Sequence, residues 1–146
     1  MVMSSEDLLD RSPAELDALY CQAPVGPIPD GVAEGQVLFL DTTPVNRLIT
    51  WCVRALAWQG KVFFRDKGYL LNLVSALRLH LVKATLSRGT SWFCPGEEAI
   101  ILDYSKTSFL AQKIRDEIRE VSPDLFIGQA YWGDRRVLSF SLHFPT

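Results

Sequence analysis

The sequence predicts a mainly β protein of the α+β class, in which a small antiparallel sheet closes into a barrel. Short apolar segments of alternating polarity recur along the chain and indicate about seven or eight strands. Short turns join several segments, and strands do not alternate regularly with helices, which disfavours a parallel sheet. The 146 residues suit a single domain, with an N-terminal helix and extended arm at 1–35 and the barrel at 36–146.

The N-terminal segment contains a helix start followed by helix-breaking residues. Ser12 supplies a capping hydroxyl, Pro13 suits the first helical position, and Glu15 places an acid in the first turn. Residues 22–35 contain repeated glycines and prolines. We therefore expect one or two short helices and then an extended arm that closes one end of the barrel.

The first strand is predicted at 36–40, where apolar residues follow one another. Thr43 and Pro44 then open a predicted helix at about 44–58, because apolar residues recur there at helical spacing and Gly60 follows. The segments 61–66 and 69–73 are predicted to form a hairpin.

Further strands are predicted at 78–87, 92–93 and 99–104. The alternation at 78–87 favours a strand, although its leucine and alanine content keeps a helix open as an alternative. Two final strands at 125–132 and 136–144 close the sheet.

A second internal helix is predicted at about 108–121. Its apolar residues fall on one helical stripe, and its charged residues then form a mostly solvated face. The stripe consists of Leu110, Ile114, Ile118 and Val121.

The composition excludes several classes of protein. Hydrophobic residues make up 48% and charged residues 22% of the chain, and the net charge is −2. This balance is ordinary for a folded protein and gives no basic surface for nucleic acid. We expect no membrane span and no signal peptide, because long apolar runs and a basic start are missing.

Three cysteines, Cys21, Cys52 and Cys94, occur at irregular spacing. Their odd number argues against a disulfide framework, and their spacing argues against a cysteine-based zinc site. A reducing cytoplasm fits this pattern best.

Metal and cofactor sites are weakly indicated. The two histidines, His80 and His143, each lie in a predicted strand and not at the spacing of a zinc site. We expect no metal and no cofactor, with one histidine as an axial haem ligand kept as an alternative. Sequence signatures of phosphate-binding loops and of nucleophilic serines are also missing.

The best polar candidate lies at the end of a strand, at Asp103 and Tyr104. Neighbouring residues of a strand point to opposite faces, so one of these two side chains meets the barrel interior. A buried carboxylate needs a cationic or hydrogen-bonding partner, and Arg115, Arg88 or Lys61 can supply one. Either a structural Asp103–Arg115 ion pair or a functional acid or base explains the pattern.

The order of short motifs resembles a known bacterial family. The motifs are Trp58-x-Gly60-Lys61-x-Phe63, a strand containing Asn72, Arg88-Gly89, Asp103 before a helix bearing Arg115, and Ile127-Gly128 before a final aromatic strand. This order is similar to the family of unknown function named for its Gly-x-Trp-x-Gly motif, which is grouped with the calycin-like barrels such as lipocalins and fatty-acid-binding proteins. The resemblance implies a calycin-like barrel with an apolar internal cavity.

The leading functional hypothesis is that the barrel binds a small apolar or amphipathic molecule. The expected ligand-binding residues are Trp58, Phe63, Asn72, Arg88, Arg115, Tyr131 and Trp132.

Two alternatives stay open. In the first, the barrel is a cofactor-independent isomerase or cyclase, with Asp103 as proton acceptor and Tyr104 or Lys61 as donor. In the second, the interior is filled and the chain is an interaction module, with a homodimer formed through the apolar helix at 44–58.

Overall fold

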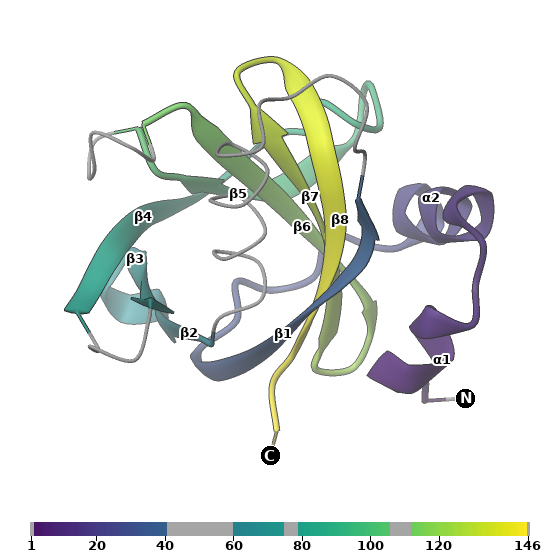
Figure 1. Cartoon of the computed structure of the whole chain (residues 1–146), viewed down its shortest axis with the longest axis horizontal. Coiled ribbons are helices and arrows are strands. Elements are labelled where there is room, and N and C mark those ends of the chain that lie inside the picture. Colours follow the sequence, from purple (N-terminus) through teal and green to yellow (C-terminus); the bar gives the residue numbers. More distant parts are fainter. Residues whose placement is uncertain (1, 41–59, 75–78, 106–111, 146) are drawn as a thin grey trace.

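The computed structural model describes residues 2–40, 60–74, 79–105 and 112–145. Within these residues eight strands form one antiparallel sheet, which closes into a barrel because β1 pairs with both β2 and β8 (Figure 1). The strands are β1 Gly31–Leu40, β2 Lys61–Phe64, β3 Tyr69–Val74, β4 Leu79–Thr90, β5 Glu98–Asp103, β6 Ile114–Ser122, β7 Leu125–Trp132 and β8 Arg135–His143. The predicted fold class is therefore confirmed, whereas the helix predicted at 44–58 lies outside the described residues.

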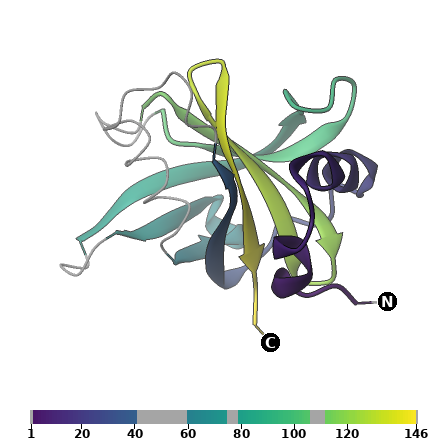
Figure 2. The same cartoon turned by 45° about the vertical axis from the view of Figure 1, so that its right-hand side comes forward.

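Two short helices precede the barrel, as predicted. They are α1, Ser5–Leu9, and α2, Pro13–Gln22, and each begins with a capping box formed by a serine. Figure 2 shows both helices on the outside of the barrel wall. Their buried side chains pack on the outer faces of Leu125 and Ile127 and form a second apolar cluster, separate from the barrel interior.

The segment between α2 and β1 lies at one end of the barrel, as predicted for the arm. Ile28 packs against the interior apolar cluster. Arg65, in the short 3-10 helix η1 (Arg65–Lys67), donates to the Ile28 carbonyl, and Arg88 donates to the Gly26 carbonyl at 2.9 Å. The arm is shorter than expected, because β1 already begins at Gly31.

The helix predicted at 108–121 is wrong for its described part, because β6 runs from Ile114 to Ser122. Residues four positions apart share one face of a helix, but they also share one face of a strand. Ile114 and Ile118 therefore satisfy both patterns, and both point into the barrel. The charged residues beside these isoleucines are not solvated as predicted, since Asp116, Glu117 and Arg119 are buried.

Two further expectations for this region are corrected. Trp92 and Phe93 belong to the loop between β4 and β5 and not to a strand. Cys21 and Cys94 form a disulfide that joins α2 to this loop across 73 positions. The expectation of no disulfide was wrong because the fold of α2 over the loop, and not the cysteine spacing, brings the two thiols together.

Candidate functional site

Within the described residues, four polar side chains lie among the apolar side chains of the barrel interior: Lys61 of β2, Asn72 of β3, Tyr104 directly after β5, and Asp116 of β6. Each is at most 2% exposed. They are surrounded by the interior apolar cluster, which includes Tyr104 itself. Buried polar groups of this kind cost free energy unless hydrogen bonds or charges compensate them. We call these four residues the interior polar cluster.

Strand alternation explains why these residues point inward. Lys61 and Phe63 are two positions apart on β2, and both are buried. Lys61 is the register partner of Asn72 on β3, so the two side chains share the interior face. Asp116 lies between two inward-facing isoleucines on β6 in the same way.

Hydrogen bonds connect three members of the interior polar cluster. Lys61 Nζ donates to Asn72 Oδ1 at 2.5 Å, and Asn72 Nδ2 donates to the Tyr104 hydroxyl at 3.0 Å. Lys61 Nζ also lies 3.5 Å from the Tyr104 hydroxyl. The Tyr104 hydroxyl in turn interacts with the carboxyl group of Asp116. Asp116 Oδ1 has no hydrogen-bond partner among the described residues, although it is buried.

Burial shifts the pKa values of this cluster toward the neutral forms. Burial raises the pKa of Asp116 to about 7, against the opposing effects of Lys61, Arg115 and Tyr104. Burial lowers the pKa of Lys61 to about 8, against the attraction of Asp116. Burial, followed by the nearby Asp116 carboxylate, also raises the pKa of Tyr104. An acid and an amine that act electrostatically on one another are therefore both buried in the barrel interior.

These two groups make opposite contributions to the pH dependence of stability. The folded chain binds more protons through Asp116 between pH 3.8 and about 7, so the free energy of unfolding falls as pH rises through that window. The unfolded chain binds more protons through Lys61 between about pH 8 and 10.5, so the free energy of unfolding rises there.

We expect Asp116→Asn to be stabilised relative to the parent chain increasingly from pH 4 to pH 7, measured by urea unfolding. A constant difference between the two proteins across this range would contradict the assignment.

The structure places the predicted site residues in different environments. Lys61, Phe63, Asn72 and Tyr104 lie together in the interior, and half-buried Trp132 packs against the same apolar cluster. The structure therefore joins Lys61, Asn72 and Tyr104 by hydrogen bonds and places Phe63 and Trp132 at the same apolar cluster.

Other predicted residues lie elsewhere. Arg88 is exposed. It donates to the Gly26 carbonyl of the arm and pairs with Glu98 at 3.3 Å. Tyr131 belongs to the outer face, where its ring contacts Trp92. Trp58 lies outside the described residues.

Asp103 and Arg115 lie on the outer face of the barrel. Leu102 and Tyr104 on either side of Asp103 point inward, so the Asp103 carboxylate points outward and accepts a hydrogen bond from the Ser105 N–H. Arg115 is its register partner but pairs with Glu117 at 2.8 Å. The expected Asp103–Arg115 ion pair is thus replaced by an Arg115–Glu117 pair. Both Asp103 and Arg115 line a shallow outer groove of about 500 Å³.

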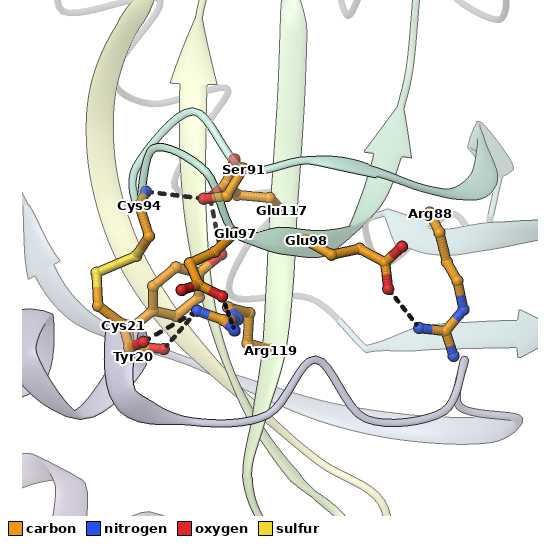
Figure 3. A network of polar contacts seen from close by, with 9 residues as sticks. All are labelled: Tyr20, Cys21, Arg88, Ser91, Cys94, Glu97, Glu98, Glu117 and Arg119. Carbon is orange, nitrogen blue, oxygen red and sulfur yellow. Dashed lines mark hydrogen bonds and ion pairs between the residues drawn. A yellow bond between two sulfur atoms is a disulfide. The ribbon is translucent and has the colours of Figure 1, made fainter.

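Glu117 organises a second buried polar network, on the outer face of β6 (Figure 3). Its carboxylate accepts hydrogen bonds from Ser91 Oγ at 2.5 Å and from the Tyr20 hydroxyl at 2.8 Å. It also accepts from the Trp92 N–H and from Arg115, each at 2.8 Å. Because these donors come from α2, the β4–β5 loop and β6, Glu117 joins three elements and fits a structural role.

The disulfide and Arg119 complete this network. The disulfide between Cys21 and Cys94 lies beside Glu117, and Cys94 N–H donates to Ser91 Oγ at 2.9 Å (Figure 3). Arg119 donates to the Cys21 carbonyl at 3.2 Å and pairs with Glu97 at 3.6 Å. These contacts attach α2 and the loop to the barrel wall.

Asp116 and Glu117 are two buried carboxylates that the sequence interpretation did not select as site residues. Assignment of 108–121 to a helix placed both on a solvated face. The available signal was the spacing of Ile114 and Ile118, which fits one face of a strand as well as one face of a helix.

Metal binding has no support in the described part of the chain, where no group of three metal-ligating side chains occurs. His143 is partly exposed, 3.9 Å from Glu34. The haem alternative through His80 or His143 stays a prediction. None of the described helices is long and apolar enough to cross a membrane.

In the described residues the fold is a small eight-stranded antiparallel barrel, and its interior holds the polar cluster. No family model and no curated protein matches this chain. It is similar to the crystal structure of a protein from Thermomonospora curvata, with a TM-score of 0.61 and 20% identity over 93% of this chain and 89% of that chain. At this identity the likeness shows the barrel fold.

Proposed function

We propose that the protein binds a small, mostly apolar molecule inside the barrel and orients it through one polar group. The observation that carries this proposal is Asp116 Oδ1, which is buried and has no hydrogen-bond partner among the described residues. An unsatisfied buried acceptor costs about 1–3 kcal/mol, which a ligand hydroxyl or amine can recover by donating a hydrogen bond.

The surroundings of Asp116 suit an amphipathic ligand. The interior apolar cluster, which includes Phe63 and contacts Trp132, supplies apolar surface, and the Tyr104 hydroxyl, which accepts from Asn72, interacts with the carboxylate. A few polar groups in an apolar cavity are typical of small-molecule sites. We include in this proposal that the barrel is calycin-like and that the protein is a bacterial lipocalin-like binding protein.

A pair of isomeric probes tests the polar contact. Both 1-decanol and methyl nonyl ether are equally large, but only the alcohol donates a hydrogen bond. At pH 8 we expect decanol to displace bound N-phenylnaphthylamine about tenfold more effectively than the ether, because a hydrogen bond to a charged group contributes about 1.5–3 kcal/mol. Fluorescence titration measures both displacements.

Two matched variants locate the effect. Asp116→Leu removes the interior acceptor and is expected to abolish the preference for decanol, whereas Asp103→Leu makes the same change on the outer face and is expected to preserve it. Equal displacement by the two probes in the parent chain would contradict the proposal. Loss of the preference in both variants would also contradict it.

A second candidate function is cofactor-independent isomerisation or cyclisation of an apolar substrate in the same cavity. The raised pKa of Asp116, beside the Tyr104 hydroxyl and the Lys61 amine, favours it. In this proposal Asp116 takes the role of proton acceptor that the sequence interpretation assigned to Asp103, and Tyr104 or Lys61 donates.

The cytoplasmic location and the homodimer stay predictions. The cysteine argument for a reducing compartment is weakened by the Cys21–Cys94 disulfide, because disulfides persist mainly in oxidising compartments.

A further inference from the structure

Lys61 is a buried amine among acid–base groups. Its side chain is 0% exposed, whereas Lys67, Lys83 and Lys113 are exposed. The Tyr104 hydroxyl lies 3.5 Å from Lys61 Nζ, and the charge of Asp116 also acts on this amine. A lysine desolvated in an apolar pocket is one of the activated nucleophiles that form Schiff bases with carbonyl compounds.

We propose that Lys61 forms a reversible imine with the aldehyde or ketone group of an apolar ligand bound in the barrel. This inference rests on the proposed function, since it requires a ligand in the same interior. It identifies the ligand class as carbonyl compounds with an apolar chain.

The reaction needs no oxidant, reductant or cofactor. The neutral Lys61 amine attacks the carbonyl carbon, so that a C–N bond forms and the carbonyl oxygen becomes a hydroxyl after proton transfer from nitrogen. The hydroxyl then takes a second proton and leaves as water, while the C=N bond forms and the last amine proton departs. One carbonyl compound and one amine thus give one imine and one water.

The neighbours of Lys61 can carry the required protons. Asp116 and the Tyr104 hydroxyl interact with one another and both act on Lys61. An acid whose pKa lies near 7 can both give a proton to the departing hydroxyl and accept one from nitrogen. The apolar surroundings also limit the access of water, which would hydrolyse the imine.

The lowered pKa of Lys61 supports this chemistry. With a pKa of about 8, roughly half of the Lys61 amine is neutral at pH 8, compared with below about 1% for an exposed lysine of ordinary pKa. The nucleophilic form is therefore common at Lys61.

Reductive trapping tests the proposal on the full chain. The protein is incubated at pH 7.5 with decanal and sodium cyanoborohydride, which reduces an imine to a stable secondary amine, and the modified lysines are mapped by mass spectrometry. We expect Lys61 to be modified at least tenfold faster than Lys67, Lys83 and Lys113, and an excess of decanol to slow this reaction selectively. Modification at equal rates on all four lysines would overturn the proposal.

Variants provide an independent check. Lys61→Arg and Lys61→Met are expected to remove the fast phase of modification, whereas Lys83→Arg retains it. Persistence of the fast phase in folded Lys61→Met would overturn the imine. If decanol displaces the fluorescent probe while Lys61 stays unmodified by decanal, the imine fails and the proposed binding function stands. If neither decanol nor decanal binds, the binding function fails as well.

Discussion

Replacing Glu117 by alanine is expected to lower the free energy of unfolding by about 3–5 kcal/mol, because it removes the acceptor of a buried ion pair. Arg115 loses its carboxylate partner, and the Tyr20 hydroxyl, Ser91 Oγ and the Trp92 N–H lose their acceptor. Urea unfolding followed by circular dichroism measures the loss.

Glu98→Ala is the matched control. Glu98 lies on neighbouring β5 in an exposed ion pair with Arg88, so its loss is expected to cost about 1 kcal/mol or less (Figure 3). Equal losses in the two variants would show that Glu117 does not organise the outer network. Glu117→Gln is expected to fall between them, because the amide keeps one acceptor oxygen but loses the charge.

Gly128→Ala is expected to destabilise the barrel by about 1–3 kcal/mol through overpacking. A Cβ at this position would overlap Phe140 Cζ and lie 2.6 Å from both Cε atoms of the ring. Gly128 and Phe140 are register partners on β7 and β8, so the ring covers the glycine directly. Phe140 is fully buried, and its ring can move only by displacing the interior cluster.

A double-mutant cycle separates this clash from a backbone effect. Phe140→Leu removes the ring, so the added methyl group in Gly128→Ala is expected to cost less in that background. The two substitutions should then show an interaction energy of about 0.5–3 kcal/mol in chemical denaturation. Strict additivity would contradict the overpacking explanation.

Most strands could be predicted from local patterns, and the failures have a common cause. The hairpin of β2 and β3 and the long strands β7 and β8 follow from alternation and turn residues. β6 was misassigned because its isoleucines, spaced four positions apart, fit the repeat of a helix and the repeat of a strand. The charged residues of β6 are also typical of a solvated helix face. Only the elements that cover them show that they are buried.

The candidate site was predicted in part. Lys61, Asn72 and Tyr104 were named separately, and the fold brings them within hydrogen-bonding distance. Asp103 was selected because it ends a strand, whereas Asp116 was assigned to the solvated face of a predicted helix. Whether each carboxylate points into or out of the barrel depends on which face of its strand lines the interior. A single residue at the end of a strand does not reveal that face.

Local chemistry alone specified the helix starts at the N-terminus, the β2–β3 turn and the alternation that makes a barrel. Tertiary structure decided which charges became buried. The buried Glu117 carboxylate on the outer face of the barrel is stable because donors from α2 and the β4–β5 loop reach it, and Cys21 meets Cys94 because α2 lies over the same loop. Partners so distant in sequence leave no local pattern, since their interaction depends on how the strands close and not on neighbouring residues.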